Sequence, residues 1–376
     1  MGPEQLLAPT TTVGAPAPYW LLVALKVLGF TLHISVMHLW FAGIVLALGW
    51  RAARSDFART MGGRLMNQMP LIISLGVNLG IVPLLFLQVS YYKVFYPATI
   101  LMAWPWLSIV ALLMVAYYGV YYYVTGLRAG RLTRLHHGAG WVAALLFIAI
   151  GFLFSSGMSL MERVDVWPES WQKWSVAGAS LGLAMHVEPG TVARWAMMLG
   201  LAVTTVAVWT VLDSALFAGR ESADYRRWAA GIGAPLYLVG LIAYVIAGSL
   251  YVFGTWLGPL KQEMFSGPHL ILTVLTAVGP GLALLLVLMA RRGATPLLAI
   301  LAGVAQLGAL ALHAISRQVV QNLKLADYML ASADPPNYQW DVLILFLLLF
   351  VGGIVLVVWM IGKAAAAYKS EITPSR

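Results

Sequence analysis

Long apolar segments alternate with short polar segments along almost the whole chain. A helix rises about 1.5 Å per residue, so roughly 20 apolar residues are needed to cross the hydrocarbon core of a bilayer. The pattern therefore predicts an all-α integral membrane protein, a bundle of about nine transmembrane helices. The predicted spans are 19–50, 67–92, 98–126, 139–161, 193–218, 228–256, 269–290, 295–317 and 340–362.

The composition supports a membrane protein and narrows its chemistry. Hydrophobic residues make up 61% of the chain and charged residues only 10%, so a bilayer is the solvent for most of the surface. The sequence contains no cysteine, which excludes disulfides, iron–sulfur clusters and covalently attached c-type heme on this polypeptide. Any redox centre here needs His or Met as its ligands.

Basic residues mark one side of the predicted bundle. The net charge of +9 is spread over loops between apolar segments, so it indicates topology rather than nucleic-acid binding. Arginines concentrate in the first, third, fifth and seventh loops, which the positive-inside rule places in the cytoplasm. Most acids lie in the alternate loops, which are then extracytoplasmic. The arginines are Arg51, Arg54, Arg59, Arg64, Arg128, Arg131, Arg134, Arg220, Arg226, Arg227, Arg291 and Arg292.

Two histidines lie inside the first predicted span. His33 lies about 20 Å along this helix, and His38 lies about one and a half turns deeper. A polar ring in hydrocarbon is costly, so each is a candidate site residue, with an interhelical hydrogen bond as the alternative role. Five residues correspond to about 140° around a helix, so one heme cannot readily use both rings.

Three further histidines lie toward the extracytoplasmic side. His186 precedes the fifth span, His269 opens the seventh, and His313 lies about one turn inside the outer end of the eighth. A plain loop residue and an interfacial cap are the alternative roles of His186 and His269. His136 and His137 lie beside loop arginines and are expected to be solvated. Imidazole ligands converging on one membrane face predict b-type heme there.

Carboxylates are nearly absent from the predicted spans. Asp213, close to the inner end of the fifth span, is the only one that the pattern places within a membrane helix. Transporters and pumps more often carry ionisable groups near the middle of the membrane, or matching broken helices in two halves. The sequence therefore weighs against a transporter.

Several segments resemble subunit I of the cytochrome bd quinol oxidases, and more closely its shorter bd-like relatives that accompany c-type cytochromes. LHISVMHLWFAGIVLAL is similar to the family's first helix, where a histidine is an axial heme ligand, and the resemblance implies this role for His33. GVNLGIVPLLFLQVSYY and GFLFSSGMSLMERVDVWPESW are similar to the second helix and to the end of the fourth. HAISRQVVQ resembles the helix that ends in a Gly-Arg-Gln-Pro-Trp signature, with Arg317 and Gln318 preserved and His313 one residue from a Glu ligand.

The chain departs from this family at residues that carry its chemistry. Met197 is nearest to the place of the histidine of the low-spin heme, and the stretch LTAVGPG lacks its methionine. The resemblance then implies that this heme is lost or moved outward onto His186 and His269. The second and third spans lack the glutamates that carry protons, and the quinol-binding loop is cut to a short stretch around 257–268. Oxygen reduction and a family-type quinol site are therefore not expected.

The leading hypothesis is an oxidoreductase subunit for electron transfer. Heme b would be ligated by His33 and His313, with His186 and His269 as further ligands, and Arg317 would pair with a propionate. Electrons would pass between the membrane quinol pool and a periplasmic c-type cytochrome or another respiratory subunit. An oxygen-reducing bd-like quinol oxidase subunit and a heme-free membrane anchor of a respiratory complex are the alternatives.

The loops also predict the organisation of the chain in the bacterial inner membrane. Residues 1–18 carry no basic region before the first apolar run, so they are expected to be a retained extracytoplasmic segment and not a cleaved signal peptide. Residues 19–362 are expected to form a single heme-binding transmembrane domain. Residues 363–376 would be a cytoplasmic tail, which places the N-terminus in the periplasm and the C-terminus in the cytoplasm.

Overall fold

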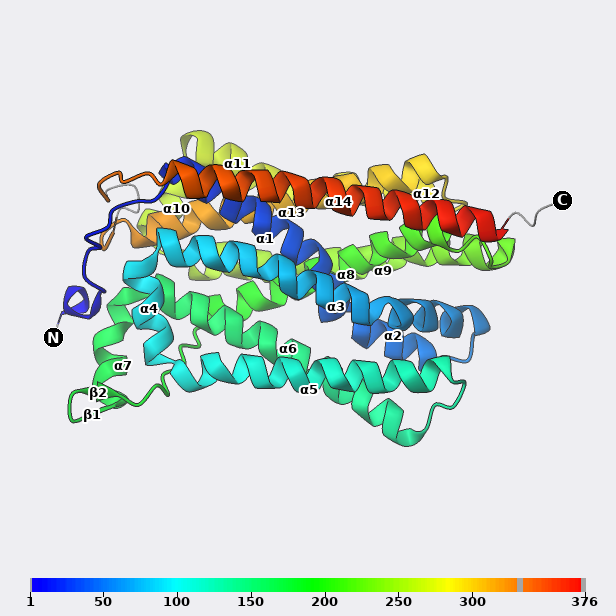
Figure 1. The fold of residues 1–376 in the computed structure, drawn as a ribbon, viewed down its shortest axis with the longest axis horizontal. Helices are drawn as coiled ribbons and strands as arrows, with labels where there is room; N and C mark the ends of the chain where they lie inside the picture. The colour runs from blue at the N-terminus through cyan, green and yellow to red at the C-terminus, as the bar shows by residue number, and fades with distance from the viewer. Residues whose placement is uncertain (1, 330–333, 373–376) are drawn as a thin grey trace.

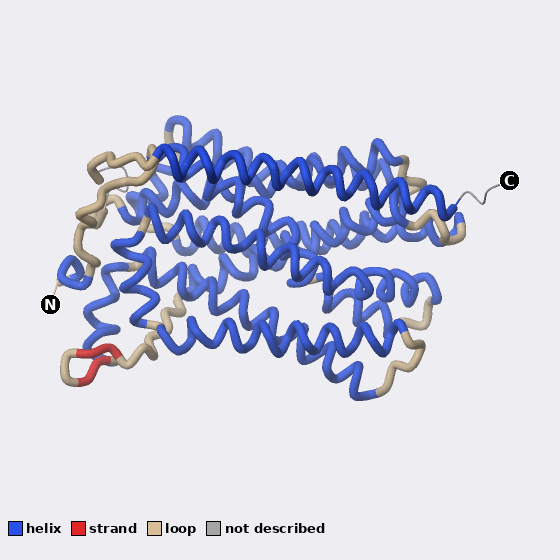
Figure 2. The backbone as a smooth tube through the Cα atoms, in the orientation of Figure 1, coloured by secondary structure: helices blue, strands red, loops and turns tan. Residues whose placement is uncertain are grey.

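A computed structural model describes residues 2–329 and 334–372. These residues form a bundle of long helices that run up and down beside one another, with one short hairpin at an end (Figures 1 and 2). The helices are η1 (Pro3–Leu6), α1 (Tyr19–Phe41), α2 (Gly43–Ala52), α3 (Asp56–Ser90), α4 (Tyr92–Leu101), α5 (Ala103–Arg128), α6 (Arg134–Glu162), η2 (Val164–Val166), α7 (Trp167–Lys173), α8 (Pro189–Leu212), the π-helical turn η3 (Asp213–Phe217), α9 (Ala223–Thr255), α10 (Gly258–Met264), α11 (Gly267–Val278), α12 (Pro280–Ala290), α13 (Pro296–Leu325) and α14 (Trp340–Ile372); the hairpin pairs β1 (Ser175–Val176) with β2 (Ala179–Ser180).

Eight helical segments of the described chain are long and apolar enough to cross a membrane. They overlap the first eight predicted spans; α1 with α2, α8 with η3, and α11 with α12 each form one of them. The prediction of an all-α membrane bundle is confirmed for these eight. The helix α14 contains a shorter apolar stretch, Trp340–Leu356, and the ninth crossing and the sidedness of the termini stay predictions.

The helices extend farther into the polar loops than the apolar pattern indicated. The helix α3 begins at Asp56 rather than near residue 67, because the Ser55 side chain caps it by accepting a hydrogen bond from the Ala58 N–H. Thr133 caps α6 in the same way. Residues expected in loops or in the tail that lie in helices are Arg59, Arg64, Arg134, His136, His137, Arg226, Arg227, Lys363 and Lys369.

A short helix, α4, joins the second and third spans where the sequence indicated only a turn. Its ten residues delay the start of α5 to Ala103, whereas the apolar run suggested residue 98. Val94, Phe95 and Leu101 of α4 are buried against the bundle, because an apolar turn of helix gains more by packing than by facing a polar loop.

The helix α8 is the centre of the bundle. In its most apolar 18-residue stretch, 61% of the residues are buried inside the protein, whereas the share is 22–33% in the other seven spans. It packs closely on α9, because a Cβ on Gly200 would lie 2.6 Å from the backbone nitrogen of Tyr244. It also contacts α1, α6 and α13. Polar side chains on α8 are therefore enclosed by neighbouring helices rather than by lipid.

The two ends of the bundle carry different elements (Figure 1). The hairpin end holds the N-terminus, α7 and the strands β1 and β2. The arginine end holds the loops 53–55, 129–133 and 291–295 and the end of α14. According to the predicted topology, the hairpin end faces outward and the arginine end faces the cytoplasm.

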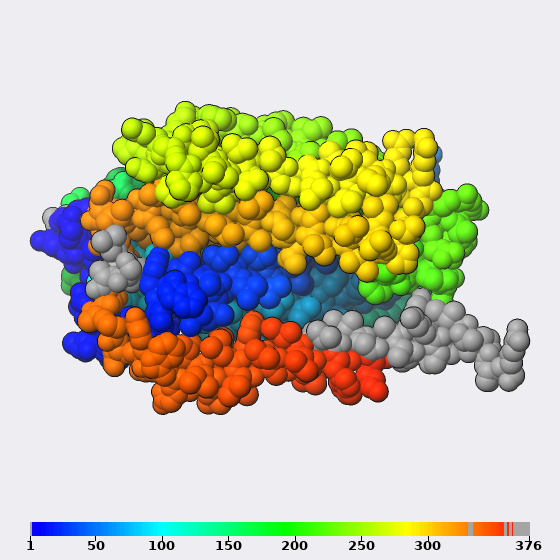
Figure 3. Space-filling model, turned by 90° about the horizontal axis from the view of Figure 1, so that it is seen from above, coloured from blue at the N-terminus to red at the C-terminus, as the bar shows by residue number. Residues whose placement is uncertain are grey.

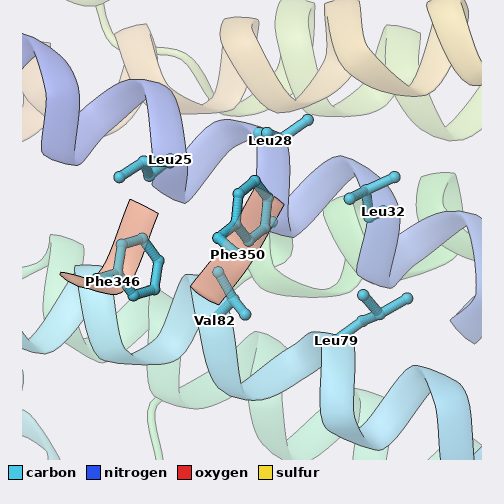
Figure 4. A pocket seen from close by; sticks show the side chains of 8 residues that line it. Leu25, Leu28, Leu32, Leu79, Val82, Phe346 and Phe350 are labelled. Atoms are coloured by element: carbon cyan, nitrogen blue, oxygen red, sulfur yellow. The ribbon is translucent and has the colours of Figure 1, made fainter. Parts of the chain in front are cut away.

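The helix α14 lies on the outside of the bundle. In Figure 3 it runs along one face, and α1 is visible between it and α13. An apolar crevice separates α14 from α1 and α3, with Leu25, Val82 and Phe350 among its walls (Figure 4). All the side chains that line this crevice are apolar, so it suits hydrocarbon and supplies no group for chemistry.

Candidate functional site

His38 is enclosed completely by the bundle. It lies near the end of α1, has no exposed surface, and places its Nδ1 2.9 Å from Thr205 Oγ1 of α8. Its Nε2 is buried and has no hydrogen-bond partner. Leaving a buried acceptor unpaired costs about 1–3 kcal/mol. When the ring proton is on Nδ1, this nitrogen has an unused lone pair, which is what a metal ligand requires.

His33 faces α3 instead. Its Nδ1 lies 2.8 Å from the carbonyl oxygen of Gly76 and must donate, because a carbonyl only accepts. A Cβ at Gly80 would lie 2.8 Å from the His33 ring, so the ring occupies a notch that only glycine leaves open. This hydrogen bond leaves Nε2 of His33 as the acceptor nitrogen, as in many metal-binding histidines. The same bond also fits the alternative role of His33, an interhelical hydrogen bond between α1 and α3. The expected divergence of His33 and His38 is confirmed.

His313 lies farther from the end of its helix than the sequence indicated. The helix α13 continues to Leu325 rather than ending near residue 317, so His313 is about three turns from the helix end instead of one. Its Nε2 lies 2.8 Å from the Tyr244 hydroxyl, which donates to the Thr276 carbonyl at 2.9 Å. Nε2 of His313 is therefore the protonated nitrogen, and binding a metal through it requires that this hydrogen bond be given up.

His33 and His313 both influence the electrostatics of His38. The three rings do not form a grouped metal-ion site within the described residues, because His33 faces α3, His38 faces α8 and His313 contacts Tyr244 of α9. The shared heme ligation by His33 and His313 stays a prediction, and His38 is the most enclosed of the three rings.

The outer histidines are separate from this group. His186 lies in the loop before α8, with Nε2 3.3 Å from Glu188 Oε2; its contact and the charge of Arg163 hold the pKa of Glu188 below its usual value. His269 is half-buried in the first turn of α11. Within residues 2–329 and 334–372, no hydrogen bond, ion pair or ring contact joins either of them to the interior histidines.

A buried cluster of charges lies at the hairpin end. Glu162, the last residue of α6, is 3% exposed, and its Oε2 accepts hydrogen bonds from Arg194 at 2.9 Å and Lys324 at 3.3 Å. Lys26 and Arg317 also interact electrostatically with this carboxylate. Four cations from α1, α8 and α13 therefore act on this carboxylate, and the half-buried Glu188 acts on two of them, Arg194 and Lys324.

Arg317 and Lys26 are the cations of this cluster that have no ion-pair partner among the described residues. The guanidinium of Arg317 stacks on Phe30, 4.8 Å from the ring centre, and no hydrogen bond or ion pair links it to another described residue. Lys26, by contrast, donates to Gln321 at 2.7 Å and lies 4.3 Å from the centre of the Tyr91 ring. Unmatched buried charge is costly, so the cluster has the capacity to bind a further anionic group.

A second buried ion pair lies at the arginine end of α8. Asp213, the first residue of η3, is fully buried and accepts two hydrogen bonds from Arg64, at 2.8 and 2.7 Å. Arg64 also donates to Glu221 at 3.2 Å. The expected carboxylate near the inner end of the fifth span is confirmed, and its two oxygens are already occupied.

The donor set fits heme better than a bare metal ion. In the described part of the chain, no three His, Cys, Asp or Glu side chains are grouped as a metal-ion site. Heme needs only one or two axial ligands, together with cations for its propionates. The unpaired Nε2 of His38 and the unmatched guanidinium of Arg317 meet these two requirements.

His38 and Glu162 are the residues that sequence reasoning undervalued. For His38 no local signal distinguished it from His33, because both lie in the same apolar span. For Glu162 no local signal existed, because it follows an apolar run and precedes a polar segment. Its burial depends on Arg194 and Lys324, which are distant in sequence.

Comparison with known proteins identifies the fold. Neither protein-family models nor curated proteins match the sequence. A chain in the structure of bd oxidase from Geobacillus thermodenitrificans matches this one with a TM-score of 0.65 and 15% identity, covering 94% of this chain and 98% of that chain. The resemblance found in the sequence is thereby confirmed at the level of the fold, over nearly the whole chain.

Proposed function

We propose that this protein is a b-type heme subunit of a respiratory membrane complex, which takes electrons from quinol and passes them to a periplasmic c-type cytochrome. The unpaired, buried Nε2 of His38 is the observation that carries the proposal. An intramembrane imidazole with a free lone pair is a suitable axial ligand for heme iron. The fold shared with a bd oxidase supports the same class of chemistry.

Each residue of the interior site has a proposed role. His38 would hold the heme iron, and His313 would be its further candidate ligand; His33, whose ring diverges from that of His38, would hold the iron only in an arrangement without His38. Arg317 pairs with a propionate, which relieves the excess positive charge at the hairpin end. His186 and His269 remain candidates for a second heme. Bound heme would supply one-electron exchange between ferric and ferrous iron, while the chain positions it and excludes water.

Oxygen reduction is a second candidate function, because the matched solved structure is that of a bd oxidase. Reduction of oxygen at a buried iron consumes protons, and carboxylates or ordered waters normally carry them through hydrocarbon. After Asp56, the helices α3 and α5 contain no Asp or Glu. Electron transfer to an external partner needs no such proton path, so it is the leading proposal.

Heme content and ligation are tested by the pyridine hemochrome spectrum of the purified protein. We expect a b-type spectrum that is abolished or shifted in His38→Ala, and altered in His33→Ala or His313→Ala if these residues complete the site. His137→Ala, on the helical extension of α6, is the matched control and should keep the parent spectrum. A parent protein without heme would contradict the proposal and favour a heme-free membrane anchor.

The electron acceptor is tested by stopped-flow oxidation of the reduced protein. We expect slow oxidation by oxygen and fast oxidation by a periplasmic c-type cytochrome, with a rate that falls as ionic strength rises, because charge steers the encounter over roughly 10 Å. Rapid turnover of oxygen without a partner protein would instead establish the oxidase function.

Orientation in the inner membrane is tested by reporter fusions. Fusions after Arg131 and Arg291 should report the cytoplasm, and fusions near Glu169 and Asp334 should report the periplasm. The reverse pattern would place the charge cluster of the hairpin end on the cytoplasmic side and would remove the periplasmic partner from the proposal.

A further inference from the structure

A chain of buried polar groups connects His38 with α13. Thr205 Oγ1 lies 2.9 Å from His38 Nδ1 and 3.0 Å from Gln306 Nε2. The same amide of Gln306 donates to Thr204 at 3.0 Å, and its oxygen accepts from Tyr237 at 3.0 Å. Both threonines and Gln306 are buried. In a membrane bundle such groups are retained only where they hydrogen-bond to one another.

The hydrogen bonds determine which nitrogen of His38 carries the proton. The single hydroxyl proton of Thr205 is donated to the Leu201 carbonyl at 3.0 Å. Its oxygen then faces His38 only as an acceptor, so His38 must donate from Nδ1. A neutral imidazole has one N–H, and the other nitrogen, Nε2, therefore presents its lone pair.

Gln306 prevents the alternative arrangement. A free threonine hydroxyl can rotate and donate to the imidazole, which would move the ring proton to Nε2 and remove the lone pair there. In this structure the Thr205 oxygen already receives the Gln306 amide and His38, and its proton is used by Leu201. All three hydrogen-bonding positions of the hydroxyl are occupied, so it cannot rotate without losing a bond.

We propose that Thr205, held by Gln306, is the positioning residue that keeps His38 in the Nδ1–H form and presents its Nε2 to a metal centre. The inference rests on the proposed function only in naming that metal centre as heme. A hydrogen bond at the far nitrogen orients a metal-bound imidazole and makes it a stronger donor, and losing such a bond costs about 10–100-fold in metal affinity.

The test uses four variants of the full-length protein in detergent. Thr205→Val removes the acceptor, and Thr205→Ser keeps it. Thr204→Val is the matched control, because Thr204 is equally buried, also donates to Leu201 and binds the same Gln306 amide, but does not touch His38. Gln306→Leu frees the Thr205 hydroxyl to rotate.

Three quantities are measured on each variant: heme affinity, midpoint potential and the tautomer of His38. Heme affinity should fall about 10–100-fold in Thr205→Val, with a raised midpoint potential because the ligand becomes a weaker donor, while Thr205→Ser and Thr204→Val keep the parent values. Gln306→Leu should show the same defect to a smaller extent. In heme-free protein, ¹⁵N-histidine NMR should show His38, assigned by its absence in His38→Ala, in the Nδ1–H form unless Thr205 is changed to Val.

The outcomes separate this inference from the proposed function. An unchanged tautomer and potential in Thr205→Val, or an equal change in Thr204→Val, would overturn the positioning role even if heme is bound. Absence of heme from the parent protein together with a Thr205-dependent tautomer would overturn the heme assignment and leave the positioning of His38 supported.

Discussion

Two buried ion clusters lie at opposite ends of α8, and they differ in how their charges are matched. At the arginine end, both oxygens of Asp213 are bonded by Arg64, which also reaches Glu221. At the hairpin end, Glu162 is surrounded by Arg194, Lys324, Lys26 and Arg317. The first cluster is complete without any ligand, whereas the second has four cations, one buried and three half-buried, against one buried and one half-buried carboxylate.

The difference separates a structural ion pair from a binding site. A bidentate arginine–carboxylate pair fixes the relative position of the two helices that carry it. Here the pair of Arg64 and Asp213 connects α3 with the end of α8. An excess of cations destabilises the empty protein and favours an anionic ligand. The heme propionates of the proposed function are such anions, and they would be bound at the hairpin end.

The largest expected effect is at the closed pair. Arg64→Met should destabilise the protein by about 3–5 kcal/mol, because it leaves the fully buried Asp213 without a partner. The double variant Arg64→Met/Asp213→Leu should recover much of this loss, because it removes both charges. Thermal unfolding in detergent, followed by size-exclusion chromatography, measures the effect. A single variant as stable as the parent would show that this pair does not hold α3 against α8.

The matched substitution at the open cluster should act on ligand binding instead. Arg317→Met should leave the heme-free protein as stable as the parent or more stable, because it removes a cation that has no anion of its own. It should weaken heme retention about tenfold or more, as expected for the loss of a charge-assisted hydrogen bond. Heme transfer to an apo-globin acceptor measures retention. If Arg317→Met destabilised the protein as much as Arg64→Met does, the hairpin-end cluster would have a structural role like that of the Arg64–Asp213 pair.

The smallest expected effect comes from the loop that covers the hairpin end. Contact with His186 and Arg163 lowers the pKa of Glu188 below its usual 4.5, so the ionised group stabilises the fold above that pH. The contribution should be lost as the pH falls through the lowered folded value, and it should be less than about 1 kcal/mol because the side chains are partly exposed. Melting temperatures of the parent and of Glu188→Gln should therefore differ near pH 6 and converge at low pH. A constant difference at all pH values would assign the effect to packing.

The pattern of apolar residues was sufficient to predict which segments form helices, but it was not sufficient to predict where those helices begin and end. Residues 67–92 are apolar enough to span a bilayer, and the corresponding helix exists, but it begins at Asp56 because Ser55 caps it. In the same way, α13 continues beyond residue 317 and ends at Leu325, which places His313 farther from the helix end. Amphipathic helix beyond the bilayer has no distinctive hydropathy, so its length depends on caps and on packing.

The sequence proposed candidate ligands by residue type, but it did not indicate which ring is most enclosed. The sequence favoured His33, whose ring lies against the glycines of α3, and gave less weight to His38, whose Nε2 is the buried unpaired atom. The two histidines lie on the same helix in similar apolar surroundings. Which one is enclosed depends on which neighbour each ring faces, and those neighbours lie far away in the sequence.

By itself, the sequence determined the all-helical membrane bundle, its polar loops and the limited set of side chains able to bind heme, because hydropathy over a span is a local property of the chain. Only the tertiary structure showed that α8 is central and that Thr205 faces His38. It also showed that Glu162 is buried among cations and that Asp213 forms a buried ion pair with Arg64. These features arise from contacts between helices, and a contact depends on the relative rotation and register of two segments, which the hydropathy of either segment alone does not specify.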